Sequence, residues 1–176
     1  MVNSLAPYVP SPPEVVKRML EVAHVGPDDV VFDLGCGDGR ILVAAVRDFG
    51  AKKAVGYEMR RDLYKQTLND IVRWDLADRI TLVNDDLLKT DLTQATVITL
   101  YLTTSGNERL RHKLENEVKN GGRIVSHDFR ITGWHHSVKE DFKSHSIYLY
   151  VMPEAADKKE DRFPRFKHKY HGYFKW

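Results

Sequence analysis

Apolar and polar positions follow two periods along the chain, so that short β-branched runs alternate with helical patterns. Apolar residues between 15 and 23 recur at helical spacing, and residues 30–34 form an apolar run broken by one carboxylate. Such alternation is typical of a parallel sheet with crossover helices. The sequence therefore predicts an α/β fold.

The same periodicities place the individual elements. We expect helices over residues 12–24, 40–49, 61–76 and from just after residue 107 to about 118. We expect strands over residues 30–34, 53–58, 80–84, 95–102, 123–127, 137–142 and 145–152. From Pro153 onwards the periodicity is lost and the chain becomes charged, so we divide it into a domain, residues 1–152, and a C-terminal tail, residues 153–176.

Length and composition fit one ordinary domain. The chain has 176 residues, of which 42% are hydrophobic and 30% charged, which is enough for a core of its own. The chain lacks an apolar stretch near the roughly 18 residues of a membrane span, and its start has no signal-peptide pattern. We therefore expect a cytoplasmic protein with no membrane partner. The net charge of +2 is too small for bulk attraction to nucleic acid.

The cysteine and histidine spacings give no sign of a metal site. Cys36 is the one cysteine, so it cannot form an internal disulfide or a cysteine cage. The pair His135-His136 and the tail histidines His168 and His171 have no carboxylate or cysteine at ligand spacing. We expect no bound metal.

The segment Asp33-Leu34-Gly35-Cys36-Gly37-Asp38-Gly39-Arg40 is the sharpest chemical signal. Alternate glycines let a loop wrap closely under a small molecule at the carboxyl end of a strand. The dinucleotide pattern G-x-G-x-x-G fails because position 40 is arginine. Asp33 and Asp38 would also repel a diphosphate, whereas they suit an ammonium group.

Two further acidic positions follow at the next strand ends. Glu58 comes about twenty residues after the loop, where a carboxylate can accept both hydroxyls of a ribose. Asp86 can accept the amino group of an adenine while Leu87 packs on the base. An ammonium, a ribose and an adenine together describe S-adenosylmethionine. The pattern therefore predicts this cofactor.

The order and spacing of these motifs over about residues 7–152 resemble the class I S-adenosylmethionine-dependent methyltransferases. More narrowly, Tyr8-Val9-Pro10-Ser11-Pro12, the glycine loop and Gly121-Gly122-Arg123-Ile124-Val125-Ser126-His127 resemble the archaeal non-SET protein-lysine methyltransferases. The resemblance implies a doubly wound, Rossmann-like seven-stranded sheet, mostly parallel, with an antiparallel last strand and helices on both faces. In one departure, Asp85 stands where that family commonly has glycine, which leaves Asp85 and Asp86 open as the adenine ligand.

The resemblance also implies methyl transfer to the ε-amine of a lysine in a protein substrate. A lysine must lose its proton before it can attack, so we expect an aromatic, dry channel. The candidates for the reacting end are Tyr8, Tyr101, His127 and Trp134, with Phe129 as an alternative to Trp134. The expected cofactor-binding residues are Tyr8, Pro10, Asp33, Gly35, Cys36, Gly37, Asp38, Glu58, Asp86, Leu87 and Tyr101.

Two other activities have less support. Thr99-Leu100-Tyr101-Leu102 lacks the Asn/Asp-Pro-Pro-Tyr/Phe motif, which argues against methylation of adenine or glutamine nitrogens. Ser126-His127-Asp128 is not expected to be a hydrolase triad, because adjacent strand residues point to opposite faces.

The end of the tail is basic and aromatic. Residues 162–176 carry five Lys/Arg, no acid and six aromatics, a mixture that single-stranded nucleic acid binding uses, although we favour packing of the aromatic residues against the protein. If the tail is mobile, Lys167, Lys169 and Lys175 are candidates for self-methylation. The alternatives to a protein-lysine enzyme are a methyltransferase for RNA or a small molecule and a non-catalytic S-adenosylmethionine-binding module.

Overall fold

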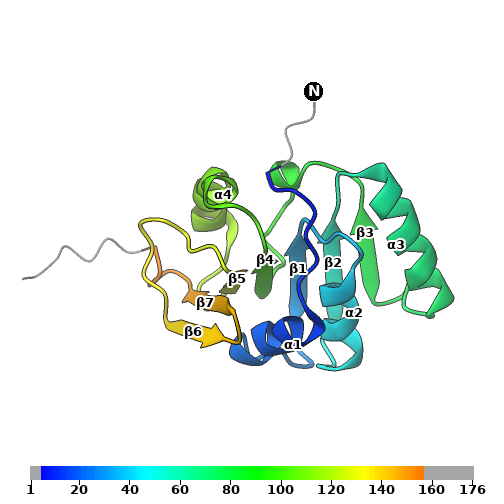
Figure 1. The fold of residues 1–176 in the computed structure, drawn as a ribbon, viewed down its shortest axis with the longest axis horizontal. Coiled ribbons are helices and arrows are strands. Elements are labelled where there is room, and N and C mark those ends of the chain that lie inside the picture. The colour runs from blue at the N-terminus through cyan, green and yellow to red at the C-terminus, as the bar shows by residue number, and fades with distance from the viewer. Residues whose placement is uncertain (1–4, 157–176) are drawn as a thin grey trace, which may run out of the picture.

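A seven-stranded sheet of order β3-β2-β1-β4-β5-β7-β6 runs through the computed structural model, which describes residues 5–156 (Figure 1). The strands are β1 (Val30–Leu34), β2 (Lys53–Tyr57), β3 (Ile80–Val83), β4 (Val97–Leu100), β5 (Arg123–His127), β6 (Val138–Phe142) and β7 (His145–Val151). β7 is antiparallel to β5 and β6, and the other pairs are parallel. The predicted fold class is confirmed.

Helices cover both faces of this sheet. They are α1 (Pro13–Val22), α2 (Arg40–Arg47), α3 (Arg61–Arg73) and α4 (Thr104–Glu117), with a short 3₁₀ turn η1 (Leu87–Lys89) after β3. Apolar residues of α1, α2 and α3 share one core cluster, whereas Leu110 and Leu114 of α4 belong to a second cluster. All four residues of β4 are buried, as expected for a central strand between two covered faces.

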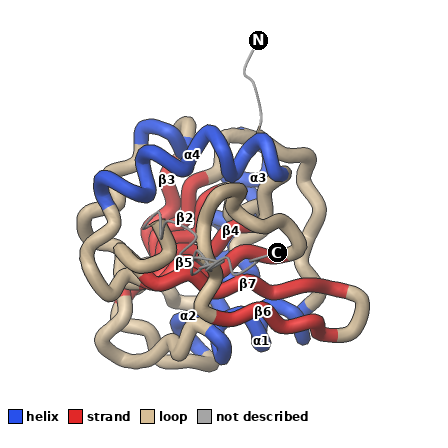
Figure 2. Tube along the Cα trace, turned by 90° about the vertical axis from the view of Figure 1, so that its left-hand side faces the viewer, coloured by secondary structure: helices blue, strands red, loops and turns tan. Residues whose placement is uncertain are grey.

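The hairpin of β6 and β7 extends the sheet at one edge (Figure 2). Ion pairs join it to α1: Arg18 Nε and Nη2 donate to Glu140 at 2.6 and 2.7 Å, and Lys143 Nζ donates to Glu14 at 2.8 Å. On the opposite face, the hydroxyl of buried Tyr150 accepts a hydrogen bond from the amide of Ile131 at 2.9 Å. The antiparallel edge is thus fixed on both faces.

The predicted start of α4 is wrong, and several other predicted ends differ from the observed ones by one to three residues. We expected α4 to begin after residue 107, yet it begins at Thr104. Thr103 acts as its N-cap, because its hydroxyl accepts a hydrogen bond from the amide of Gly106 at 3.1 Å. The Thr-Thr-Ser-Gly-Asn segment that we treated as a loop is therefore a capped helix start.

Packing continues past the predicted end of the domain. Ala155 is buried in the second cluster, and its amide donates to the carbonyl of Val151 at 2.9 Å. Residues 157–176, including the basic and aromatic segment, lie outside the described residues. Within residues 5–156, the helices are too short or too polar to cross a membrane.

The packing of α4 gives a direct test of the fold. Leu114→Ala removes a side chain that is fully buried against the sheet, and we expect the free energy of unfolding to fall by about 2–5 kcal/mol. Leu68→Ala is the matched control, because Leu68 on α3 is 37% exposed and its loss should cost less than about 1 kcal/mol. Urea denaturation monitored by circular dichroism measures both changes, and equal changes would contradict this placement of α4.

Candidate active site

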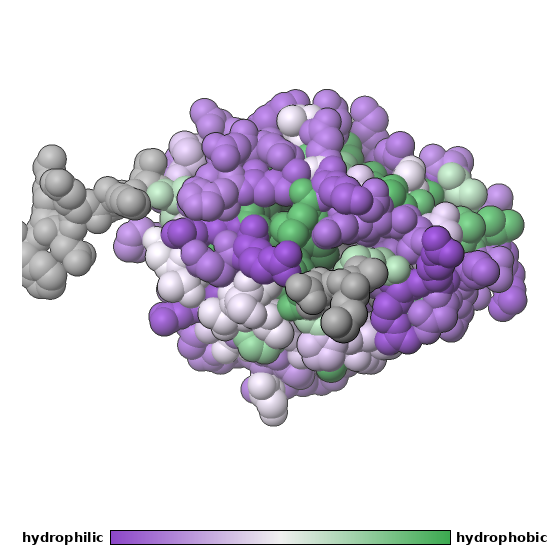
Figure 3. Space-filling model, turned by 90° about the horizontal axis from the view of Figure 1, so that it is seen from above, coloured by the Kyte–Doolittle hydropathy of each residue, from purple (hydrophilic) through white to green (hydrophobic). Residues whose placement is uncertain are grey.

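A cavity of about 900 Å³ opens at the carboxyl edge of the sheet, above the ends of β1, β2 and β4. Seen from above in Figure 3, this face has a hollow in which hydrophobic surface shows between hydrophilic borders. The volume lies in the range of small-molecule and cofactor sites. The predicted cofactor residues that line it are Tyr8, Pro10, Asp33, Gly35, Cys36, Gly37, Asp38, Glu58, Leu87 and Tyr101.

The glycine loop forms the floor of the cavity. Gly35, Gly37 and Gly39 have φ of 91°, 54° and 75°, in the left-handed region that other residues rarely adopt. At Gly37 the lack of a side chain also matters for packing, because a Cβ there would lie 2.5 Å from Cε2 of Tyr8. The loop therefore needs glycine at position 37 both for its backbone and for the Tyr8 ring.

The segment before α1 crosses this edge and brings Tyr8 over the loop. Its first described residue, Leu5, is buried, and the Leu5 carbonyl accepts a hydrogen bond from Thr103 Oγ1 at 3.0 Å. At the other end, Arg40 Nη1 donates to the carbonyl of Ser11 at 2.6 Å. Between these anchors the side chain of Tyr8 is 39% exposed, and the Arg60 guanidinium lies 5.9 Å from the centroid of its ring. Residues 5–11 thus form one wall of the cavity.

Asp33 is the most deeply buried carboxylate of the site. Thr99 Oγ1 donates to its Oδ1 at 2.7 Å. The pKa of Asp33 is raised to about 7, mainly by burial and also by the nearby charges of Asp38 and Glu58, while the Thr99 hydrogen bond acts to lower it. A positively charged group in the cavity would favour the ionised form of Asp33.

Asp38 already forms an ion pair with Arg40. Burial alone would raise the pKa of Asp38, but the Arg40 guanidinium outweighs burial and lowers it. Arg40 Nη2 lies 2.6 Å from Oδ2 of Asp38, and Arg40 Nε lies 2.9 Å from Oδ1. Of the two carboxylates that we considered for an ammonium group, Asp33 is therefore the one without a cationic partner on the described residues.

Glu58 follows β2 and holds the loop. Its Oε2 accepts a hydrogen bond from the amide of Gly37 at 3.0 Å, and its Oε1 accepts one from the amide of Arg60 at 2.7 Å. Each carboxylate oxygen can accept a second bond. Glu58 can therefore still accept two ribose hydroxyls while it fixes the glycine loop.

The pair of aspartates after β3 divides between two roles. Asp85 and Leu87 line the cavity. Asp86, which we assigned to the adenine, does not line it and instead caps η1, where its Oδ1 accepts a hydrogen bond from the amide of Leu88 at 3.0 Å. Of the two aspartates left open by the sequence, Asp85 is thus the one at the cavity wall.

Tyr101 follows β4 and lies on His127. Their ring centroids are 3.8 Å apart, and the Tyr101 hydroxyl donates to Asp128 Oδ2 at 3.4 Å. His127 is fully buried, and burial lowers its pKa to about 4. Tyr101 lines the cavity, whereas His127 does not. His127 can therefore act on a bound molecule only through Tyr101 or through Ser11, whose Oγ lies 2.8 Å from His127 Nδ1.

Trp134 and Phe129 also lie away from the cavity lining. The Trp134 indole packs edge-on against Tyr150 and donates to Glu115 at 3.0 Å. The Phe129 ring lies 6.2 Å from that of Tyr101. Our prediction that Trp134 faces the substrate has no support in its position, because the indole belongs to the core beside α4.

The segment Ser126-His127-Asp128 departs in part from expectation. Ser126 points away from His127, and its hydroxyl donates to the carbonyl of Phe129 at 2.5 Å. Asp128 has φ of 59°, so its carboxylate turns back beside His127 instead of projecting from the opposite face. His145 and Ser11 were not predicted as site residues, because they reach this region from β7 and from the segment before α1.

Comparison with known proteins gives consistent matches. The family model described as "ANTKMT methyltransferase domain" matches residues 33–138. A protein-lysine N-methyltransferase of Saccharolobus islandicus is 45% identical over 152 residues, covering 84% of this chain and 94% of that protein. The adenine nucleotide translocase lysine N-methyltransferase of Mus musculus is 31% identical over 73% of this chain, which spans only 55% of that longer relative.

A solved structure is also similar over nearly the whole described region. The crystal structure of an RNA methyltransferase from Salinibacter ruber in complex with S-adenosyl-L-homocysteine has a TM-score of 0.82 and 39% sequence identity. The match covers 87% of this chain and 99% of that one.

The contact between Gly37 and Tyr8 leads to a binding prediction. Gly37→Ala places a methyl group against the Tyr8 ring and strains a left-handed backbone. We expect it to weaken S-adenosylhomocysteine binding by at least about tenfold, which corresponds to about 1.4 kcal/mol. Gly26→Ala is the control, because a Cβ at Gly26 meets nothing within 4 Å. Isothermal titration calorimetry measures both affinities, and unchanged binding by Gly37→Ala would contradict this wall of the cavity.

The raised pKa of Asp33 gives a pH prediction. Because the native state holds this proton up to pH about 7, ionisation is unfavourable without a cation, and a bound sulfonium and ammonium favour it. We expect affinity for S-adenosylmethionine to rise as the pH increases towards and through about 7. The free energy of unfolding of the ligand-free protein should fall as the pH rises from the ordinary aspartate pKa to about 7. In this range the unfolded chain has already released the Asp33 proton, whereas the native protein still holds it.

Asp33→Asn is the matched variant, because it keeps an acceptor for Thr99 and removes the titrating group. Calorimetry over a pH series should show weaker binding by this variant and a flatter pH dependence than in the wild type. Equal slopes in the two proteins would show that another group controls the pH dependence.

Proposed function

Because this chain belongs to the family of ANTKMT methyltransferase domains, we propose that it transfers a methyl group from S-adenosylmethionine to the ε-amine of a lysine in a protein substrate. It is an S-adenosylmethionine-dependent methyltransferase, so the non-catalytic alternative falls away. The observation that carries the choice of lysine is the 45% identity, over 94% of its length, to a protein named as a protein-lysine N-methyltransferase.

The residues around the cavity suit this cofactor. We assign Asp33 to the ammonium group, Glu58 to the ribose hydroxyls, and the Asp85–Leu87 segment to the adenine. This order follows the strand ends from β1 to β3, and we propose that the sulfonium lies near Tyr8 and Tyr101. The bound cofactor supplies an activated methyl group, and the chain's residues position it.

The chemistry asks little of acid or base groups. A neutral lysine nitrogen attacks the methyl carbon in line with the carbon–sulfur bond, which breaks as the carbon–nitrogen bond forms. The lysine must first give its proton to solvent, and a low-dielectric, aromatic approach favours the neutral amine. Tyr8 and Tyr101 line the cavity at this end, and we propose that they orient the amine by hydrogen bonds and ring contacts.

A second candidate, methylation of RNA, rests on one observation. The Salinibacter ruber structure, with 39% identity to this chain, is described as an RNA methyltransferase. In that case the basic and aromatic residues 162–176 would be candidates for binding the RNA. These residues lie outside the described residues. We place protein lysine first because several relatives carry that name.

The acceptor can be identified with methyl-labelled cofactor. We expect label from S-adenosylmethionine to enter a whole-cell extract in a form that resists ribonuclease, is lost on protease treatment and yields methyl-lysine on hydrolysis. Glu58→Ala is the inactive control, because it removes the ribose acceptor and the hydrogen bond to Gly37. Loss of the label on ribonuclease treatment would contradict the protein-lysine proposal and would identify RNA as the acceptor.

Two finer proposals need experiments of their own. A methyl increment on the enzyme itself, seen by intact-mass spectrometry, would support self-methylation at Lys167, Lys169 or Lys175. We also propose a cytoplasmic location, which fractionation of the source cells with detection of this protein would test. Recovery in the membrane fraction would contradict it.

A further inference from the structure

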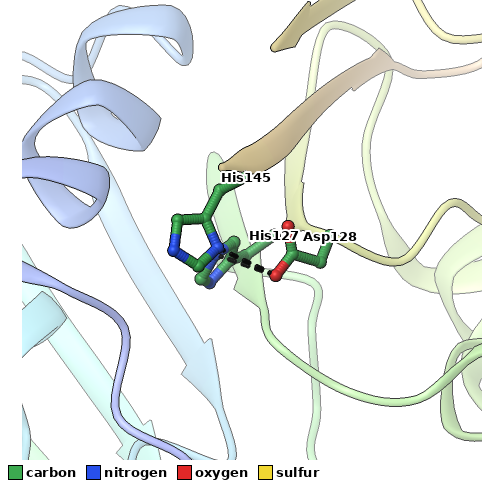
Figure 4. A group of neighbouring side chains, drawn as sticks. All are labelled: His127, Asp128 and His145. Atoms are coloured by element: carbon green, nitrogen blue, oxygen red, sulfur yellow. Dashed lines mark hydrogen bonds and ion pairs between the residues drawn. The ribbon is translucent and has the colours of Figure 1, made fainter. Parts of the chain in front are cut away.

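Three metal-ligating side chains converge where β5 ends and β7 begins. They are His127, Asp128 and His145 (Figure 4), and within residues 5–156 no other group of three or more His, Cys, Asp or Glu side chains is so arranged. His127 Nε2 lies 2.9 Å from His145 Nδ1 and 3.3 Å from Asp128 Oδ2, and His145 Nδ1 lies 3.0 Å from the same oxygen. The three atoms form a nearly equilateral triangle.

The size of this triangle matches a metal coordination shell. Zinc binds imidazole nitrogen and carboxylate oxygen at about 2.0–2.2 Å, and an ion about 2.05 Å from each of the three atoms would subtend ligand–metal–ligand angles from about 90° to about 107°. These values lie between octahedral and tetrahedral geometry. Two histidines and one carboxylate are also a donor set that divalent transition metals commonly take.

The outer contacts of the triangle orient its ligands. His127 Nδ1 faces Ser11 Oγ at 2.8 Å, so when Nδ1 carries the ring proton, Nε2 points its lone pair into the triangle. Asp128 Oδ1 accepts a hydrogen bond from the amide of Ser146 at 2.9 Å, which leaves Oδ2 directed at both imidazoles. Such support of the non-ligating atoms is typical of metal-binding histidines and carboxylates.

Protons alone satisfy the triangle poorly. A proton on His145 Nδ1 can point at His127 Nε2 or at Asp128 Oδ2, and the third edge then joins two lone pairs. One cation bound to all three atoms satisfies them together.

We propose that His127 Nε2, His145 Nδ1 and Asp128 Oδ2 bind a divalent transition-metal ion such as Zn²⁺. The side chains of Asp128 and His145 are 27% and 26% exposed, whereas that of His127 is fully buried. The ion therefore enters from the side of Asp128 and His145, and water completes its coordination there. This revises our expectation of no metal, which rested on sequence spacing alone.

The site lies one side chain away from the cavity. Tyr101 stacks on His127 and lines the cavity, and Ser11 lines it as well. A bound ion would fix the His127 ring and, through it, the Tyr101 ring that stacks on it. It would thereby fix the cavity wall that Tyr101 forms. The metal site is distinct from the residues that we assign to the cofactor.

Metal binding can be measured without the methyltransferase reaction. We would incubate the untagged full chain with Zn²⁺, remove free metal by gel filtration and determine bound zinc by mass spectrometry, with a parallel Co²⁺ sample for visible absorption spectra. We expect about one ion per chain, cobalt spectra of a four- or five-coordinate site, and a higher melting temperature with Zn²⁺ than with EDTA.

The variants separate a metal site from a hydrogen-bonded cluster. His145→Asn and Asp128→Asn keep polar atoms near the same positions and should abolish binding, and Ser11→Ala should weaken it by about 10–100-fold. His112→Ala removes a histidine whose side chain is 80% exposed, and the double variant His168→Ala/His171→Ala removes the tail histidines; both should retain the ion.

Melting in EDTA shows whether His145→Asn and Asp128→Asn are folded. Absence of stoichiometric binding by the wild type, or equal binding by these two folded variants, would overturn the proposal. Loss of the ion in the His168→Ala/His171→Ala protein would also overturn it, because the tail would then supply the ligands.

Discussion

Negative charge held against glycine backbone at the carboxyl edge of the sheet is the constraint on which the site depends. Parallel strands bring Asp33 and Glu58 to one edge, and the amide of Gly37 donates directly to Glu58. Burial is the main cause of the raised pKa of Asp33, and the negative charges of Asp38 and Glu58 add to it. A cationic nucleoside favours the ionised form of Asp33, whereas a diphosphate would disfavour it. The choice of cofactor thus follows from the electrostatics of the apoprotein.

The segment before α1 completes the site by covering this charged edge. Residues 5–11 are tied to α4 through Leu5 and Thr103 and to the glycine loop through Ser11 and Arg40. Tyr8 rests on Gly37 between the two anchors. A single segment therefore joins the cofactor loop to the wall that contains Tyr101. Substitution of Tyr8 or Gly37 should therefore alter the geometry of the cavity both at the cofactor loop and at the Tyr101 wall.

The sequence predicted the elements that follow from local hydrophobic patterns. It did not predict features that depend on a helix cap, a left-handed residue or long-range strand pairing. β1 and β5 have their predicted bounds because glycines mark one end of each strand: Gly35 follows β1, and Gly121-Gly122 precede β5. The start of α4 was missed because Thr103 was taken as loop, not as a cap. The approach of Asp128 to His127 was missed because a left-handed residue breaks the alternation of strand side chains. His145 arrives by a long-range antiparallel pairing that no local spacing reveals.

The central claim is that this edge selects a sulfonium nucleoside over a pyrophosphate nucleotide. The most direct measurement is a calorimetric comparison of S-adenosylmethionine with NADH and ADP on the same protein preparation at neutral pH. We predict stoichiometric binding of S-adenosylmethionine and binding of both nucleotides that is at least about a hundredfold weaker, or about 2.7 kcal/mol. Comparable affinity for NADH or ADP would contradict this claim.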